Sequence, residues 1–509
     1  MTFDTMWEKY RFCLLSVPII LFLAFLLRLW NLTYSPALAH DEGIHLGQSY
    51  ELLLGNAFPG LRRLTYNYQG NVYHLGFVPF ALVAFFFSIL GVGVFQARLA
   101  SILIDTASTY LVYSFGSRLF SRRVGLLASF LYAINWLAIY SSRRFTQDAY
   151  MSFFIVLGLY VWWFGKGKAK TMTMALSGTL LGLGVLCKLS GAAFLFIILA
   201  TYLIESLMKR RFESPKRILF IPLAFSVIVV FLWFAPGLLL DTDTVIGQVF
   251  RYSVTTRAHW VRPQTFHGLM QSLFSLFLTY QEIFIYLLLL CLAAVFGLVN
   301  FLRKRNTAGI FLTVWILAFS AIILRGFSVF GVAINYFTSI LPPISMLTSS
   351  IILELPVKVP NPLFGRSYRK LPRKKTVALG LFLLILAIQA SYGLTMDVRL
   401  IMQASTEPFE VADWISANVP ASSKIVGSPK IAFLCRDRVF YDYYGGVTTV
   451  IRGPEDYELN YELMKSVNYI VIDEHFKWFP GINRELRQFL ETNCTLSKTI
   501  GKTDIYSAN

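Results

Sequence analysis

The chain has 509 residues, of which 56% are hydrophobic, 16% are aromatic and only 15% carry a charge. With a mean hydropathy of +0.59, this composition excludes an ordinary water-soluble protein and predicts a polytopic membrane protein. The net charge of +18 would suit nucleic acid, but the segment from Met396 onward holds 15 acidic and 12 basic residues. The positive excess therefore lies in short loops between apolar runs, which follows the positive-inside rule and excludes nucleic acid as a partner.

The first apolar run, residues 14–30, is long enough to cross a bilayer and is expected to stay as an anchor. Eleven further runs follow, at 77–94, 98–117, 125–142, 150–164, 172–187, 190–208, 218–239, 281–301, 309–324, 332–353 and 376–395. This pattern predicts a transmembrane domain over residues 1–395, with a first outer loop at 31–97 that carries juxtamembrane helices.

Basic clusters between the runs predict the topology. They lie at 118–123, 166–170, 209–211, 303–305 and 358–375. All of them fall on one side only if one early run does not cross, and 77–94, which Pro79, Gly91 and Gly93 interrupt, is the best candidate for a helix against the outer leaflet. We therefore expect about eleven crossings in a plasma or inner membrane, with a cytoplasmic N-terminus.

The tail, residues 396–509, has a different character. Residues 408–415 have the pattern of an amphipathic helix, and 424–427 and 469–473 that of short buried strands. We expect a small extracytoplasmic α/β domain that gives structural support or docks an acceptor, because it has no glycine-rich phosphate loop and no metal-spaced cysteine and histidine cluster. Cys435 and Cys494 both lie in it, but two cysteines leave open whether they form a disulfide.

Two adjacent acids, Asp41 and Glu42, follow the first apolar run in the stretch Ala39-His40-Asp41-Glu42-Gly43. Acids beside lipid in so apolar a chain favour a functional site over the alternative, a solvated helix start. With the topology above, Asp148, Lys188 and the loop 240–280 face the same side as Asp41. If 77–94 crosses instead, Asp148 and Lys188 move to the opposite face.

One more acid lies within an apolar run. Asp105 is expensive to place in lipid and is expected to face the bundle interior, in a structural role.

Six segments together resemble the polyprenyl-phosphate-sugar-dependent glycosyltransferases of the GT-C fold, which include protein O-mannosyltransferases and aminoarabinose transferases. They are AHDEG at 39–43, VYHLG at 72–76, RLAS at 98–101, SRLF at 117–120, YSSRRFTQDA at 140–149 and GTLLGLGVLCK at 178–188. The resemblance covers roughly residues 10–345. It implies an integral-membrane enzyme that moves a sugar from a polyprenyl-phosphate donor in the membrane lipid to a protein, lipid or glycan acceptor, with inversion.

Such transfer breaks a bond between the sugar and a phosphate, so the acceptor needs a base and the phosphate needs positive charge. Asp41 is the candidate base, because an acid at the membrane boundary can face an acceptor in water and a donor in lipid. Glu42 is expected to orient the loop or to assist. Asp148 resembles the family's second acidic position. The resemblance leaves open two alternatives, a divalent cation, Mg²⁺ or Mn²⁺, shared by Asp148 and Asp41, and a reaction without a metal.

For the donor phosphate, the first candidate is Lys188, an ammonium at the outer end of an otherwise apolar run. Arg143 and Arg144 are second candidates, with interfacial snorkelling as the alternative for both. His74 and Arg262 are further candidate phosphate ligands. His74 precedes Leu75 where the family often has a His-Pro or Lys-Pro pair, which is a departure from the family's pattern, and Arg262 lies in the basic and aromatic loop 240–280.

Two other classes of protein stay open from the sequence alone. A transporter or flippase of a lipid-linked sugar would also have many spans and intramembrane charge, but internal repeats and matching broken helices are expected of it. A nonenzymatic membrane scaffold would explain the tail but not the acids.

Overall fold

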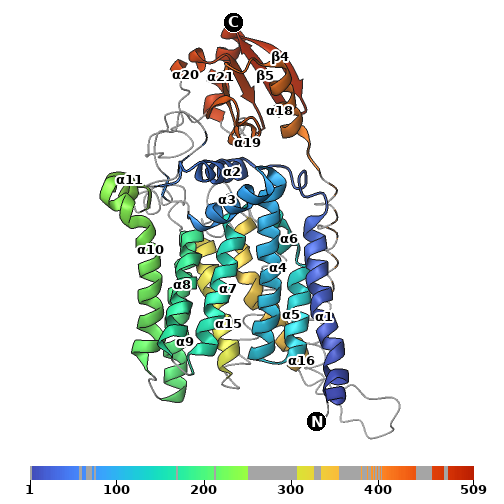
Figure 1. Ribbon diagram of the computed structural model, residues 1–509, viewed down its shortest axis with the longest axis vertical. Coiled ribbons are helices and arrows are strands. Elements are labelled where there is room, and N and C mark those ends of the chain that lie inside the picture. Colours follow the sequence, from blue (N-terminus) through green and yellow to red (C-terminus); the bar gives the residue numbers. More distant parts are fainter. Residues whose placement is uncertain are drawn as a thin grey trace.

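The computed structural model describes residues 3–56, 60–62, 64, 72–73, 76–167, 170–210, 214–249, 306–325, 334–354, 404–442, 461–474 and 480–509, and single positions between 380 and 402. It shows a bundle of upright helices with a small α/β domain at one end (Figure 1). The upright helices are α1 (Phe3–Leu29), α4 (Val94–Leu119), α5 (Arg122–Ala133), α7 (Gln147–Gly165), α8 (Thr171–Cys187), α9 (Phe194–Lys209), α10 (Ile221–Leu240), α15 (Thr307–Arg325) and α16 (Leu341–Glu354).

Within these described ranges, three helical segments are long and apolar enough to cross a membrane: Gln147–Gly165, Leu189–Lys209 and Lys216–Leu240. A fourth is added if α5 and α6 (Trp136–Ser142), which are bent by 59° at the break between them, count as one span. The shorter apolar helices are Ser16–Leu29, Val78–Leu90, Thr171–Cys187 and Thr307–Ile322. The expected run 281–301 lies outside the described residues, so about eleven crossings stays a prediction.

Small residues set the spacing of neighbouring helices. Gly178 and Gly182 of α8 stand one turn apart, and a Cβ on either would meet the backbone of α10 at Pro222 or Ser226. Without a hydrophobic driving force between helices in lipid, close approach of backbones is what stabilises such pairs. The apolar run 172–187 therefore packs as a helix against 218–239.

The run 77–94 forms α3 (Val78–Leu90), which lies beneath α2 (His40–Leu53) at the end of the bundle that carries the α/β domain (Figure 1). Both flanks of α3 contact this end. Gly76 packs against the Leu186 and Cys187 carbonyl groups where α8 ends, and the Val92 carbonyl accepts a hydrogen bond from Arg436 at 3.5 Å. This geometry agrees with the expectation that 77–94 does not cross the bundle.

The α/β domain contains one five-stranded sheet in the order β2-β1-β3-β5-β4. Its strands are β1 (Lys424–Gly427), β2 (Val439–Asp442), β3 (Tyr469–Ile472), β4 (Cys494–Ile500) and β5 (Thr503–Ala508). β1 pairs in parallel with β2 and β3, while β5 is antiparallel to β3 and β4. The helices of this domain are α18 (Glu407–Asn418), α19 (Pro429–Leu434), α20 (Tyr461–Ser466) and α21 (Pro480–Asn493).

The predicted helix at 408–415 and the two predicted strands are confirmed by α18, β1 and β3. Ile425, Val471 and Ile505 are fully buried and form part of the core of this domain. Cys435 and Cys494 are both free thiols, so the structure contains no disulfide between them.

The α/β domain rests on α2 through the short helix α19. The first turn of α2 approaches so closely that a Cβ on Gly43 would overlap the backbone of Pro429 and Lys430. Nearby, Phe433 stacks on Phe87 of α3, with ring centroids 6.2 Å apart. The domain is therefore seated directly over the turn that carries the two adjacent acids.

Candidate active site

Asp41 lies in the first turn of α2 and is exposed. Ala39, at the N-cap, provides no side-chain hydrogen bond, so the helix dipole and free backbone amides favour an acid in this turn. Asp41 makes no hydrogen bond or ion pair with the described part of the chain. Its carboxylate is thus accessible to a ligand.

Glu42 has the opposite environment, because it is only 1% exposed. Arg98 of α4 donates to both of its carboxylate oxygens, at 2.8 and 2.7 Å, and the Phe145 amide donates to one of them at 2.9 Å. Burial by itself would raise the pKa of Glu42, but the Arg98 charge and these hydrogen bonds hold it below its ordinary value. Glu42 therefore ties α2 to α4 and to the turn before α7.

Asp148 and Lys188 come from different helices and meet in an ion pair. Asp148 lies in the first turn of α7, and Lys188 is the residue at which α8 ends. The Lys188 Nζ is 2.7 and 2.9 Å from the two Asp148 carboxylate oxygens and 3.9 Å from the centroid of the Tyr336 ring. Both side chains are largely but not fully buried: the Lys188 side chain is 17% exposed and the Asp148 side chain 6%.

His45 links the two groups of charges. It lies one turn after Asp41 on α2, and its Nδ1 is 3.2 Å from the Phe145 carbonyl oxygen. Burial lowers its pKa, the charge of Asp41 opposes that shift, and the charge of Lys188 reinforces it. His45 therefore joins α2 to the turn before α7, and Asp41 and the Lys188–Asp148 pair lie at the same end of the bundle, as the sequence predicts.

The two arginines proposed for the phosphate differ in their surroundings. Arg143 is fully buried, and its guanidinium donates to the carbonyl groups of Arg28 at 2.8 Å and Ser35 at 2.7 Å. It fixes the end of α1 and is not placed to meet a ligand. Arg144 is half-buried, with its guanidinium 4.5 Å from the Tyr140 ring centroid. His74 and Arg262 lie outside the described residues.

The cation expected between Asp41 and Asp148 stays a prediction. Both Asp148 oxygens already accept from the Lys188 ammonium. Within the described ranges, no group of three or more His, Cys, Asp or Glu side chains is placed to hold a metal ion. We therefore derive no chemical step through a metal.

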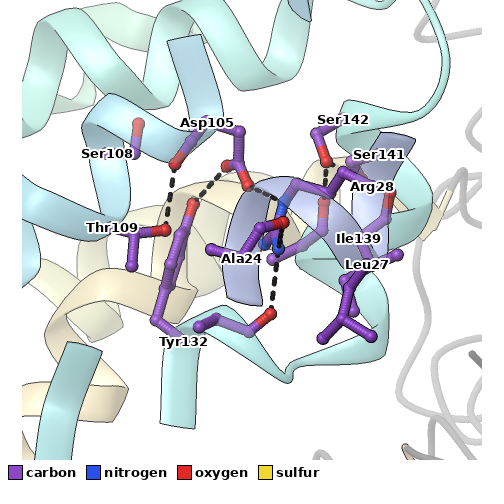
Figure 2. A network of polar contacts seen from close by, with 12 residues as sticks. Ala24, Leu27, Arg28, Asp105, Ser108, Thr109, Tyr132, Ile139, Ser141 and Ser142 are labelled. Carbon is purple, nitrogen blue, oxygen red and sulfur yellow. Dashed lines mark hydrogen bonds and ion pairs between the residues drawn. The ribbon is translucent and has the colours of Figure 1, made fainter. Parts of the chain in front are cut away.

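A second buried network lies deeper in the bundle and explains Asp105 (Figure 2). The Asp105 carboxylate accepts hydrogen bonds from Arg28 Nε at 2.7 Å and from the Tyr132 hydroxyl at 2.7 Å, and Asp105 is 1% exposed. Arg28 also donates to the Ala133 carbonyl at 2.9 Å. The prediction that Asp105 faces the interior is confirmed, and its role is to join α1, α4 and α5.

Arg98 is a site residue whose role the sequence did not reveal. It stands near the start of an apolar run, in the segment RLAS, and a lone arginine there is the signal that could have indicated a buried acidic partner. Which acid it meets depends on where the fold places the start of α2 relative to the start of α4.

Two juxtamembrane acids, a lysine–acid pair and an α/β domain seated over them therefore meet at one end of the helical bundle. Residues 75–234 match the sequence pattern of the family described as dolichyl-phosphate-mannose-protein mannosyltransferase. A search of curated protein sequences finds no match. This match and the solved structures described next confirm the resemblance expected from the six segments at the level of the GT-C fold.

Two solved structures illustrate the likeness. ArnT from Cupriavidus metallidurans in the apo state has a TM-score of 0.63 and is 14% identical, and the alignment covers 98% of each chain. The oligosaccharyltransferase of Archaeoglobus fulgidus in its apo form has a TM-score of 0.58 at 14% identity, over 92% of this chain and 70% of that one. At this identity the match shows the fold, which is the GT-C fold.

Proposed function

We propose that this protein transfers a sugar from a polyprenyl-phosphate donor to an acceptor at the extracytoplasmic face of the membrane, with inversion. The observation that carries the proposal is the gathering of one open acid, Asp41, and one partly exposed lysine, Lys188, at one end of a helical bundle with the GT-C fold. In support, ArnT has also been solved bound to undecaprenyl phosphate, and the A. fulgidus enzyme with a dolichol-phosphate and an inhibitory peptide.

The environments of Asp41 and Glu42 decide which of the two acids acts as the base. Glu42 is held by Arg98 and the Phe145 amide, so its oxygens are occupied. Asp41 is open, so it takes the proton of the acceptor nucleophile. The acceptor atom then bonds to the sugar C1 as the bond from C1 to the phosphate oxygen breaks, and the electron pair leaves with the phosphate.

Lys188 is the group that stabilises the departing phosphate. A phosphate carries more negative charge than the Asp148 carboxylate, so it competes for the ammonium, and the Tyr336 ring keeps the ammonium in place. Arg144, with its charge at the same end, is the second candidate, whereas Arg143 is left out because of its buried contacts. A divalent cation is not needed for this scheme, although the A. fulgidus enzyme has been solved with Zn and sulfate.

The function is tested with purified protein in lipid nanodiscs, incubated with radiolabelled undecaprenyl-phosphate mannose or aminoarabinose and with a membrane extract as acceptor source. Glycosyl transfer to any extract component supports the proposal. Movement of the labelled lipid between leaflets of proteoliposomes without release of the sugar would instead favour a flippase.

The orientation is tested by labelling single engineered cysteines in intact cells, in a Cys494→Ser background. We expect Lys424→Cys, in the α/β domain, to react with an impermeant thiol reagent, because this exposed residue is proposed to lie outside. Lys170→Cys, exposed at the opposite end of the bundle, should react only after the cells are opened. Reaction of Lys170→Cys from outside would contradict the proposed topology.

Lys188→Ala is expected to weaken undecaprenyl-phosphate binding about 10- to 150-fold, because a charge-assisted hydrogen bond contributes roughly 1.5–3 kcal/mol. The dissociation constant is measured by ligand titration of the purified variant. Lys166→Ala is the matched control, since Lys166 pairs with Glu205 at the other end of the bundle.

A double variant separates phosphate contact from simple loss of the ion pair. Lys188→Ala alone leaves Asp148 as an unpaired carboxylate that would itself repel a phosphate. In Lys188→Ala with Asp148→Ala that repulsion is gone, and binding should remain weak. Recovery of wild-type affinity in the double variant would show that Lys188 only neutralises Asp148.

A further inference from the structure

His45 is a titratable side chain at the site that the scheme above does not use. Its ring packs between Phe80 of α3, with ring centroids 5.4 Å apart, and Phe145, with centroids 5.8 Å apart. Asp41 lies four residues earlier on α2, so the two side chains share one face of the helix. The ring is therefore held between two aromatic side chains, on the helix face that carries the open acid.

The hydrogen bond to Phe145 decides which ring nitrogen carries the proton. The Phe145 carbonyl oxygen can only accept, so the Nδ1 that lies 3.2 Å away must donate its hydrogen. Burial lowers the pKa of His45 below its ordinary value, which favours a single proton on the ring. The second nitrogen, Nε2, then holds a lone pair and makes no hydrogen bond within the described part of the chain.

We propose that His45 is a further ligand-positioning residue of the site, whose Nε2 accepts a hydrogen bond from a hydroxyl group of the substrate held beside Asp41. The inference rests on the proposed function and deepens it. The hydroxyl belongs either to the sugar of the donor or to the acceptor. An imidazole suits either, because its neutral Nε2 accepts a hydrogen bond from a hydroxyl group without adding a charge beside Asp41 and Lys188.

Two substitutions separate this role from a structural one. His45→Asn keeps a donor that can bond the Phe145 carbonyl, since the Asn amide resembles the Nδ1 side of the ring, but it removes the Nε2 acceptor. His45→Phe keeps the packing and removes both polar atoms. If the ring only holds Phe145, His45→Asn should behave like the wild type and His45→Phe should not. If Nε2 contacts substrate, both variants should be impaired.

The probes are bare undecaprenyl phosphate and undecaprenyl-phosphate mannose. We expect His45→Asn to bind the bare lipid phosphate like the wild type. A sugar hydroxyl as the partner predicts about 3- to 10-fold weaker binding of the mannosyl lipid, the range for one neutral hydrogen bond. An acceptor hydroxyl predicts unchanged binding of both lipids and a similar fall in kcat/KM for the acceptor in a membrane extract.

Wild-type binding and transfer by His45→Asn would overturn the proposal for His45 while leaving the proposed function intact. Equal weakening of the bare and the mannosyl lipid would also overturn it, because the effect would then lie at the phosphate. If the wild-type protein neither binds nor transfers from the mannosyl or aminoarabinosyl lipid, the proposed function itself fails. Thermal melting of both variants confirms that each is folded before it is compared.

Discussion

Asp41→Asn should reduce the initial rate of glycosyl transfer by about 10²- to 10⁴-fold, the usual contribution of a positioned general base. The substitution keeps the size of the side chain and removes its ability to accept a proton. Because Asp41 is exposed and has no hydrogen bond in the described part of the chain, the fold should be unchanged. Undecaprenyl-phosphate binding should also persist, since the phosphate contacts are assigned to Lys188.

Asp243→Asn is the matched control, because Asp243 is an exposed acid in α11 (Thr242–Ile246), at the same end of the bundle. It should transfer at nearly the wild-type rate. Full activity in Asp41→Asn, measured with saturating donor, would remove this residue from the mechanism. Asp41 would then be what the sequence also allowed, an acid at the solvated start of a helix.

Glu42 shows how far sequence reasoning reached at this site. Two adjacent acids after the first apolar run indicate a helix start at the membrane boundary. The sequence does not show that one carboxylate is exposed and the other is neutralised by a partner. It depends on Arg98, 56 residues away, which reaches Glu42 only when the fold brings the starts of α2 and α4 to the same end of the bundle. Local patterns indicate where such groups lie, but long-range packing decides their partners.

The elements themselves were more predictable. Apolar runs and basic loops indicated most of the described helices, because length and hydropathy are set by the bilayer. Alternation in the tail indicated α18, β1 and β3. The approach of α19 to Gly43 could not be predicted, since a single glycine in a helix start carries no sign of what packs against it.

The assignment of Arg143 is the clearest case in which a sequence signal suggested more than one role. Adjacent arginines before Asp148 have the composition of a phosphate site. In the structure they diverge, since one is fully buried against backbone carbonyls and the other is half-buried over a tyrosine ring. Helical spacing alone could not separate them, because they lie at the break between α6 and α7.

Asp105→Leu should be the most destabilising single change in the bundle interior, by about 3–5 kcal/mol, because it leaves the buried Arg28 guanidinium without its ionic partner. Tyr132→Phe removes one neutral hydrogen-bond donor to the same carboxylate and should lower the stability of the protein by only about 1 kcal/mol. The measurement is the thermal inactivation rate of each purified variant in one detergent, since large membrane proteins unfold irreversibly.

The decisive comparison is the double variant Arg28→Met with Asp105→Leu. Replacing both members of a buried ion pair by apolar residues of similar size is often neutral or stabilising, whereas removing one is costly. We therefore expect the double variant to inactivate more slowly than Asp105→Leu. Its loss of stability should differ by at least 1 kcal/mol from the sum of the losses in the two single variants. Some loss should remain, because Arg28 also donates to the Ala24 and Ala133 carbonyl groups. Strict additivity would mean that the network in Figure 2 does not act as a unit, and that Asp105 joins α1 and α4 through packing alone.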